Sequence, residues 1–280
     1  MSQRVALQFY RDERHRPPFS IRLPELTGQH ELSTNGVDTQ CAVSLVQQLF
    51  KEDANGIKVD LLTASDRDGV LAALHRECWG DKIVSSLYCE DCDDFFDLSF
   101  TLSELQRHLL SQQSEKNFQQ TVVKNATVQV DQHHLSIPVS SQETVLGNLP
   151  ESEGLNQLLK TCCDFDDGAD GGIGENTNDK VEDLSKKLSD SKVESIAAEL
   201  EQVAPILDLD LDATCPDCNR QHQASFDIQS FVLQRLLNEK ERLLAEVHLI
   251  ALNYGWSLQE ILSLPRKTRK SIADLIEQSL

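Results

Sequence analysis

The sequence has little positive charge, few aromatic residues and no long apolar run. Of its 280 residues, 46 are acidic and 26 are basic, which gives a formal net charge of -20. A surface of this charge repels the phosphates of nucleic acids and the head groups of anionic lipids, so nucleic acid is not an expected partner. No segment approaches the run of about 18 apolar residues that indicates a membrane-spanning helix, so we expect no membrane span.

A secretion signal and a recognisable catalytic motif are also missing. The start Met1-Ser2-Gln3-Arg4 lacks the apolar core of a signal peptide, so we expect a protein that stays in the cytosol. The sequence contains no Gly-rich phosphate-binding loop, no nucleophilic Ser elbow and no pair of carboxylates set in an apolar frame. These absences predict a protein that is not an enzyme.

Cysteine, in contrast, is present in a metal-binding pattern. Eight cysteines without a secretion signal predict reduced thiols. Four of them form two Cys-x-x-Cys pairs, Cys89 with Cys92 and Cys215 with Cys218. Four thiolates are the number that a closed tetrahedral zinc site needs, and two intervening residues let a tight turn present both sulfurs to one ion. The other four cysteines are expected to be small, buried or partly buried thiols: Cys41, Cys78, Cys162 and Cys163.

The residues around the two cysteine pairs predict β-hairpins. Ile83, Ser85 and Leu87 alternate with other residues before the first pair, and leucine alternates with aspartate over residues 207–212 before the second. A period of two is typical of a half-buried strand. A Ser-Phe dipeptide follows each pair at the same distance, so the two stretches repeat. We predict two hairpins whose turns share one structural zinc through all four cysteines, which couples metal binding to folding.

Three other interpretations of the cysteine pairs stay open. A thiol oxidoreductase also uses Cys-x-x-Cys, but its motif lies near a βαβ pattern and at a helix N-terminus, whereas strands follow both pairs here. A ribbon can keep its hairpins and hold no metal. A zinc-ribbon regulator would bind nucleic acid, which the acidic charge disfavours.

The whole chain is predicted to be α+β, with zinc-ribbon-like hairpins flanked by helices. We expect four segments. Residues 1–60 form an N-terminal arm and short helix, and residues 61–163 form a first half with one hairpin. Residues 164–180 form an acidic flexible linker, and residues 181–280 form a second half with the other hairpin and C-terminal helices. Residues 1–24 are expected to form an extended arm. Residues 121–139 are expected to form a further β pair, with its turn from Asp131 to His134.

Apolar spacing predicts the main helices. One begins at Thr63 or Ser65 and ends at Gly80, with His75 partly exposed on it. The longest is expected as a single helix over residues 228–254, stopped by Gly255. A capping box at Ser257 then opens a short helix, and a basic helix over residues 266–280 completes a C-terminal helical hairpin.

A family resemblance is carried by the C-terminal stretch from Glu246 to Pro265. It contains Glu-Val-His at 246–248, Tyr-x-Trp at 254–256 and Leu-Pro before the basic helix. This order resembles the family of baseplate hub assembly chaperones of T-even-type phages, which has relatives in contractile injection systems. The resemblance also covers residues 62–68 and 79–83, both cysteine pairs with their following strands, and residues 21–26 as the start of the family pattern.

The resemblance implies a structural or assembly role without enzymatic activity. The protein would help to build or cap a baseplate at the hub end of a contractile tail, in a bacterial cytoplasm or in the assembled particle. Its partners would be other baseplate, hub or spike proteins. Our candidates for partner contact are two aromatic residues and the dense basic cluster: Tyr254, Trp256, Arg266, Lys267, Arg269 and Lys270. The alternatives are that Trp256 packs in a core and that the cluster neutralises its own acidic neighbours.

Overall fold

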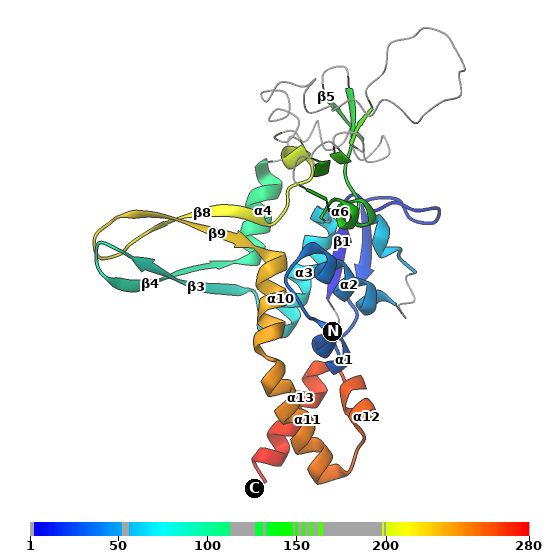
Figure 1. Cartoon of the computed structure of the whole chain (residues 1–280), viewed down its shortest axis with the longest axis vertical. Helices are drawn as coiled ribbons and strands as arrows, with labels where there is room; N and C mark the ends of the chain where they lie inside the picture. Colours follow the sequence, from blue (N-terminus) through cyan, green and yellow to red (C-terminus); the bar gives the residue numbers. More distant parts are fainter. Residues whose placement is uncertain are drawn as a thin grey trace.

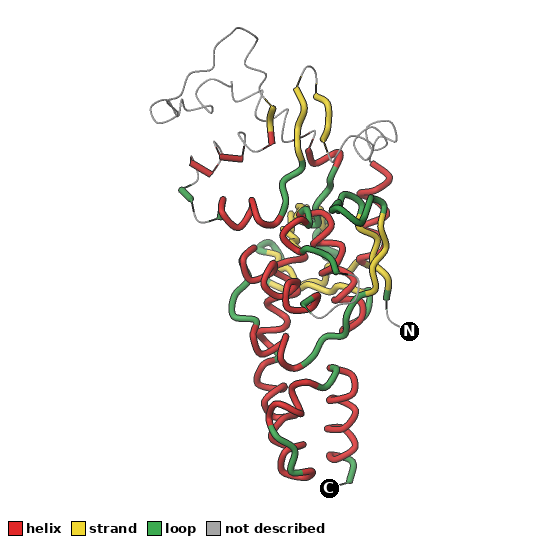
Figure 2. Tube along the Cα trace, turned by 90° about the vertical axis from the view of Figure 1, so that its right-hand side faces the viewer, coloured by secondary structure: helices red, strands yellow, loops and turns green. Residues whose placement is uncertain are grey.

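The computed structural model describes residues 3–51, 56–112, 127–130, 133–147, 149–150, 153–154, 157–158, 162–164, 198 and 200–279. Figure 1 shows a central body, an arm made of two β-hairpins that projects to one side, and C-terminal helices that extend from the lower end of the body. The turned view in Figure 2 shows the same C-terminal extension below the body. The arm and the extension thus both project from the body.

The elements follow one another in a mixed order. The strands are β1 (Arg4–Leu7), β2 (Phe19–Arg22), β3 (Lys82–Cys89), β4 (Asp94–Thr101), β5 (Thr127–Val130), β6 (His133–Ser136), β7 (Cys163–Asp164), β8 (Asp208–Thr214) and β9 (Gln221–Asp227). The helices are α1 (Gly28–Ser33), α2 (Thr39–Phe50), the short 3-10 helix η1 (Val59–Leu61), α3 (Ala64–Trp79), α4 (Leu102–Gln112), α6 (Ser140–Leu146), α10 (Ile228–Asn238), α11 (Lys240–Tyr254), α12 (Leu258–Ser263) and α13 (Arg266–Glu277). The predicted α+β class, with antiparallel hairpins flanked by helices, is confirmed.

The N-terminal segment belongs to the core of the body. β1 pairs with β2 in an antiparallel hairpin, with Val5 opposite Ile21. Leu7, Tyr10 and Ile21 are fully buried in one cluster with residues of α2, α3 and α10. The expected extended arm over residues 1–24 is therefore wrong. The charged residues and prolines of this segment obscure a short period-two pattern, in which Val5 and Leu7 point inward.

Helix α3 connects the two halves of the chain through two buried carboxylates near its N-terminus, Asp66 and Asp68. The Thr63 hydroxyl caps the helix by accepting the Asp66 N–H, as predicted. The Asp66 carboxylate accepts the backbone N–H groups of Gln8 at 2.6 Å and of Phe9 at 3.1 Å. The Asp68 carboxylate accepts the Leu207 N–H at 2.8 Å. One helix N-terminus thus fixes both the N-terminal hairpin and the start of the second half.

Asp68 makes stability depend on pH. Burial raises the pKa of Asp68 to about 7, although the Leu207 N–H and Arg67 favour the charged form. Because this folded-state pKa lies above the unfolded-state value of about 3.9, the folded chain binds the proton more tightly, and stability falls as pH rises towards 7. We expect wild type to lose on the order of 1–3 kcal/mol relative to Asp68→Asn between pH 5 and pH 8.

Urea unfolding at the two pH values measures this difference. Asparagine keeps an oxygen that can accept the Leu207 N–H but removes the titrating group, so other titrations cancel in the comparison. The matched control is Asp274→Asn, an exposed position on α13 that should follow wild type. A stability difference between wild type and Asp68→Asn that stays constant with pH would show that Asp68 does not titrate with folding.

The two hairpins of the arm belong to a longer repeat. β3 pairs with β4 and β8 with β9, and Tyr88 opposite Phe95 has the same register as Thr214 opposite Gln221. Each hairpin leads directly into a helix, and both α4 and α10 have 11 residues. In each unit the first N–H of the helix donates to the carbonyl that precedes the hairpin. Leu102 donates to Asp81 at 3.0 Å in the first unit, and Ile228 donates to Leu207 at 2.9 Å in the second. The repeating unit is therefore strand, turn, strand and helix.

The longest predicted helix is interrupted. Glu239 leaves the helical conformation, with φ of -92° and ψ of 1°, and separates α10 from α11. Its carboxylate accepts the Trp79 indole N–H at 2.7 Å and binds Arg266, so contacts with distant residues accompany the break. The prediction of a single helix over residues 228–254 is wrong. The predicted stop is confirmed, because Gly255 adopts the left-handed conformation with φ of 67°.

Histidines in the first half differ from their predicted positions. His75 is fully buried on α3, against Trp79 and Phe231, so its predicted partial exposure is wrong. His133 and His134 lie in β6, opposite Val130 and Gln129, rather than in the turn. The acidic linker predicted over residues 164–180 falls outside the described residues from residue 165 onward. Among the helices that the structure describes, none has the length and apolar character required to cross a membrane.

Candidate metal centre

The four cysteines of the two pairs converge at the far end of the arm. Both hairpin turns meet there, on the left of Figure 1. Their sulfur atoms all lie within 4.8 Å of one another. The Sγ atoms of Cys89 and Cys218 are 3.6 Å apart, and those of Cys92 and Cys215 are 3.8 Å apart. These distances exceed the roughly 2.05 Å of a disulfide bond, and all four residues are free thiols. The predicted convergence of the two pairs is confirmed.

The spacing of the sulfur atoms fits a four-coordinate metal ion. A regular tetrahedron of sulfurs, each about 2.3 Å from a zinc ion, has edges of about 3.8 Å. The two measured cross-hairpin distances, 3.6 Å and 3.8 Å, are close to this edge. A set of four sulfur ligands is typical of zinc or of iron. Four protein ligands leave no position for a water molecule, so this arrangement is that of a structural rather than a catalytic site.

The turn backbones take the same shape in both repeats. The residue after the second cysteine of each pair, Asp93 or Asn219, has a positive φ of 56° or 60°. Asp and Asn are the residues other than glycine that adopt this conformation most readily. In the second turn, hydrogen bonds from the backbone N–H groups of Cys218 and Asp217 lower the pKa of Cys215 to about 7. The turn therefore stabilises a thiolate, the form of cysteine that binds a metal.

Proton sharing among the thiols links metal binding to pH. The hydrogen bond with Cys218 and, after it, burial raise the pKa of Cys92, whereas the pKa of Cys215 is lowered. The metal-free cluster therefore holds protons that an incoming ion has to displace, and metal affinity should rise with pH.

The two hairpins pack about a local two-fold axis. The contact between Cys89 and Cys218 becomes the contact between Cys215 and Cys92 when the repeats are exchanged. The ring of Phe96 lies 5.2 Å from that of His222, its counterpart in the other repeat. Further along the arm, two further equivalent rings, Phe100 and Phe226, meet edge to face at 5.0 Å. The sulfur cluster therefore lies on this axis, and an ion bound there would join the two repeats symmetrically.

One cation spans the junction between the turns. Arg220 of the second hairpin binds Asp91 of the first and lies 3.8 Å from Glu90. Exposed pairs of this kind contribute little to stability, because solvent screens the charges. The guanidinium also places positive charge beside the four sulfurs, where it would offset part of the excess negative charge of a four-thiolate metal site. Arg220 thus complements the cluster without being a ligand.

The other cysteines lie apart from this cluster. Burial raises the pKa of Cys78 to about 12, and burial likewise raises the pKa of Cys41. Cys162 is buried. The prediction of buried or partly buried thiols is confirmed for these three, and the side chain of Cys163 lies outside what the structure describes.

The predicted partner residues separate into exposed and buried groups. Tyr254 and Trp256 are 54% and 39% exposed, and their rings lie 5.5 Å apart. The alternative that Trp256 packs in a core is therefore wrong. Lys267 is exposed and Lys270 is partly exposed. The partner role of these four residues stays a prediction.

Arg266 and Arg269 have to be removed from the predicted contact surface. Both are buried, and both bind the buried carboxylate of Glu31 in α1. Arg269 also donates from Nε to Glu246 at 2.9 Å. The alternative that this cluster neutralises acidic neighbours is the one that the structure supports for these two residues.

Apart from the general alternative that the basic cluster neutralises acidic neighbours, sequence reasoning identified none of the partners in this ion network. The guanidiniums of Arg235 and Arg266 lie over the Trp79 ring at 4.9 Å and 5.1 Å, and the indole N–H reaches Glu239. Glu31 comes from the opposite end of the chain. No local pattern marks such a pairing, because short acidic and basic stretches are usually solvated. The network joins α1, α3, α11 and α13.

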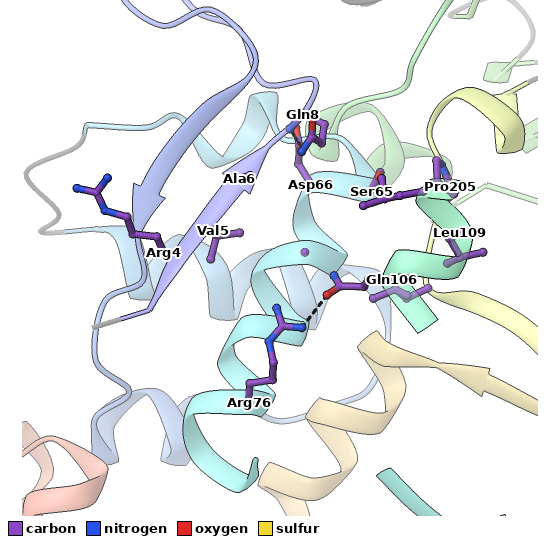
Figure 3. Close-up of a pocket in the computed structure, with 13 residues that line it drawn as sticks. Arg4, Val5, Ala6, Gln8, Ser65, Asp66, Arg76, Gln106, Leu109 and Pro205 are labelled. Atoms are coloured by element: carbon purple, nitrogen blue, oxygen red, sulfur yellow. Dashed lines mark hydrogen bonds between the residues drawn. The ribbon is translucent and has the colours of Figure 1, made fainter. Parts of the chain in front are cut away.

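A cavity of about 220 Å³ lies between β1, α3 and α4, and Figure 3 shows its lining. Arg76 donates to Gln106 at 2.7 Å across it. The lining acid Asp66 already accepts backbone N–H groups from Gln8 and Phe9. Asp66 therefore holds the N-terminal hairpin against α3.

Comparison with known proteins matched the sequence to one family. The sequence model of the family described as T4 bacteriophage base plate protein matches residues 21–233. This range begins where the predicted family pattern begins and contains both hairpins with all four cysteines. It ends within α10, before the stretch from Glu246 to Pro265, so the resemblance of that stretch stays a prediction. Comparisons with curated proteins and with solved structures gave no match.

Proposed function

The chain belongs to the family of the T4 bacteriophage base plate protein, and from this membership we propose that it is a non-enzymatic assembly protein at the hub end of a contractile-tail baseplate. The family implies a structural role in a baseplate that is built together with other baseplate proteins. The observation that supports a scaffold is the convergence of four sulfurs from two repeats at the end of the arm. The arm, whose two hairpins pack together, and the helical extension both project from the body, where partner proteins can reach them.

In this proposal a zinc ion, held by Cys89, Cys92, Cys215 and Cys218, joins the two turns. A structural zinc contributes directly to folding free energy when its ligands lie far apart in sequence. The ion would fix the relative position of the hairpins, while the body keeps its own apolar core. Iron is the alternative that the four-sulfur donor set allows, and metal analysis of the purified protein distinguishes the two.

The proposed docking surface lies on the C-terminal extension. Leu252, Tyr254, Trp256 and Leu258 are exposed at the end of α11 and the start of α12. Exposed apolar residues that gather in this way indicate a protein interaction site. Lys267 on α13 supplies a basic charge in the same extension. We propose that this surface binds another baseplate protein.

The two alternative functions have less support. A redox Cys-x-x-Cys gains its reactivity at a helix N-terminus, whereas both pairs here lie in hairpin turns and their sulfurs meet across the pairs. A nucleic-acid regulator needs a basic surface, and two of the four residues in the dense basic cluster are buried against glutamates.

Affinity purification from cells that make the particle tests the proposed role. We expect mass spectrometry to identify other baseplate proteins with the wild-type chain. The variant Tyr254→Ser/Trp256→Ser should recover them at least about tenfold less, because truncating central aromatic residues commonly costs 2 kcal/mol or more of binding. Its metal content should not change. Recovery of nucleic acid, or of no baseplate protein, would contradict the proposed function.

The matched control is Leu110→Ser/Val145→Ser, which changes two exposed apolar residues on the body. This control should recover baseplate proteins as well as wild type does. If it loses them to the same extent as the Tyr254→Ser/Trp256→Ser variant, the loss reflects general surface polarity and the C-terminal surface is not a specific contact.

A further inference from the structure

The outer face of the first hairpin carries an unpartnered aromatic pair at the end of the arm. Tyr88 and Phe95 lie directly opposite each other in β3 and β4, with ring centroids 5.2 Å apart. They are 45% and 69% exposed, whereas the inner faces of the two hairpins pack against each other. Val84 is exposed on the same face. Exposed apolar surface of this kind marks an interaction site more often than a packing feature.

The second hairpin shows that the fold does not need these aromatics. At the same register it has Thr214 and Gln221, whose side chains hydrogen-bond to each other at 3.2 Å. The inner faces of the two hairpins carry the same residue types at equivalent positions, namely the cysteines and the phenylalanines Phe100 and Phe226. The outer faces differ. The same hairpin and the same sulfur geometry therefore form in the second repeat without an aromatic pair at this register.

Carboxylates lie directly beside the aromatic rings. The Tyr88 hydroxyl donates to Asp93 in the turn. Asp97 lies on the same face, where it accepts the Ser86 hydroxyl at 2.8 Å. Arg220, the basic residue of this tip, binds Asp91 in the turn rather than Asp93 or Asp97. A ring face next to exposed carboxylates that bind no basic residue of this tip is complementary to a guanidinium, which stacks on aromatics and pairs with carboxylates.

We propose that the face formed by Tyr88, Phe95, Asp93 and Asp97 docks a basic, arginine-containing segment of another baseplate protein. This inference rests on the proposed function and gives the arm a contact surface of its own, for a basic partner segment. A second copy of this chain does not fit, because its net charge is -20. Its Arg266 and Arg269 are buried against Glu31, so the cluster cannot present them to another copy.

The test uses the full-length, zinc-loaded chain and a short labelled peptide in which arginine alternates with leucine. The informative variant is Tyr88→Thr/Phe95→Gln, which gives the first hairpin the outer residues that the second already has. Fluorescence anisotropy should show wild-type binding and at least about tenfold weaker binding by this variant. Tyr254→Ser/Trp256→Ser should stay within about twofold of wild type, since it changes a different surface.

A second variant separates charge from aromatic contact. Asp93→Asn/Asp97→Asn keeps both rings, and Asn is tolerated at the left-handed position because Asn219 occupies its counterpart. It should weaken binding and reduce the dependence of affinity on salt. Equal affinity of wild type and Tyr88→Thr/Phe95→Gln, at unchanged metal content, would overturn the inference. Failure of the proposed function is a separate result, namely the absence of baseplate proteins from the wild-type purification.

Discussion

Replacing Cys215 and Cys218 by serine is expected to release the metal ion and to lower the free energy of unfolding by on the order of 3–5 kcal/mol. The variant leaves only Cys89 and Cys92, which are two ligands from a single turn and do not complete a tetrahedral site. The loss is limited because the body has its own core of buried residues from β1, β2, α2, α3 and α10. Metal analysis and urea unfolding of the purified proteins measure both effects.

Cys41→Ser is the control for the loss of a thiol as such. Cys41 is partly buried on α2, where its thiol donates to Asn35, and it lies outside the sulfur cluster. This variant should keep its metal and lose no more than about 1 kcal/mol of stability. If the Cys215→Ser/Cys218→Ser protein retains as much metal as wild type, the four cysteines do not form one site.

The second large effect is expected from the ion network that joins the two ends of the chain. Arg269 is fully buried and binds both Glu31 and Glu246. Arg269→Ala would leave these carboxylates buried with less positive charge, and breaking a buried ion pair from one side costs about 3–5 kcal/mol. Urea unfolding should show this decrease. A separate measurement, amide hydrogen exchange, should be faster over residues 28–33, because α1 then separates from the C-terminal helices.

Lys267→Ala provides the matched comparison on the same helix. Lys267 pairs with Glu77 but is largely exposed, so its removal should cost less than about 1 kcal/mol. A further variant, Arg269→Met/Glu31→Leu, removes charge from both sides and should recover part of the lost stability. Equal costs for Arg269→Ala and Lys267→Ala would show that the buried network does not hold the C-terminal helices on the body.

The features that sequence patterns predicted are those with local physical causes. The spacing within each cysteine pair determines a turn, and period-two alternation determines which face of each strand is buried. The matching stretches also indicated that the hairpins form equivalent units. The left-handed stop at Gly255 and the capping box at Ser257 likewise depend only on neighbours along the chain. These elements agree with the structure. The convergence of the sulfurs is a long-range contact that was predicted on a different ground, because one tetrahedral ion needs the ligands of both pairs.

The features that sequence patterns did not predict depend on partners far along the chain. Arg266 and Arg269 look like a solvated basic face until Glu31 is brought against them by the fold. The break at Glu239 accompanies a contact with Trp79, which belongs to the first half. The extension of the repeat into α4 and α10 was hidden because the two helices bury different side chains after Leu102 and Ile228. Contacts of this kind, between residues far apart in the chain, leave no pattern in the sequence around either residue.

The most direct test of the shared metal site combines native mass spectrometry with zinc-edge X-ray absorption on the purified full-length protein. We predict one zinc ion per chain, surrounded by four sulfur atoms at about 2.3 Å. Two ions per chain, each with two sulfurs and lighter ligands, would contradict this prediction, and so would a metal-free protein that keeps the same arm.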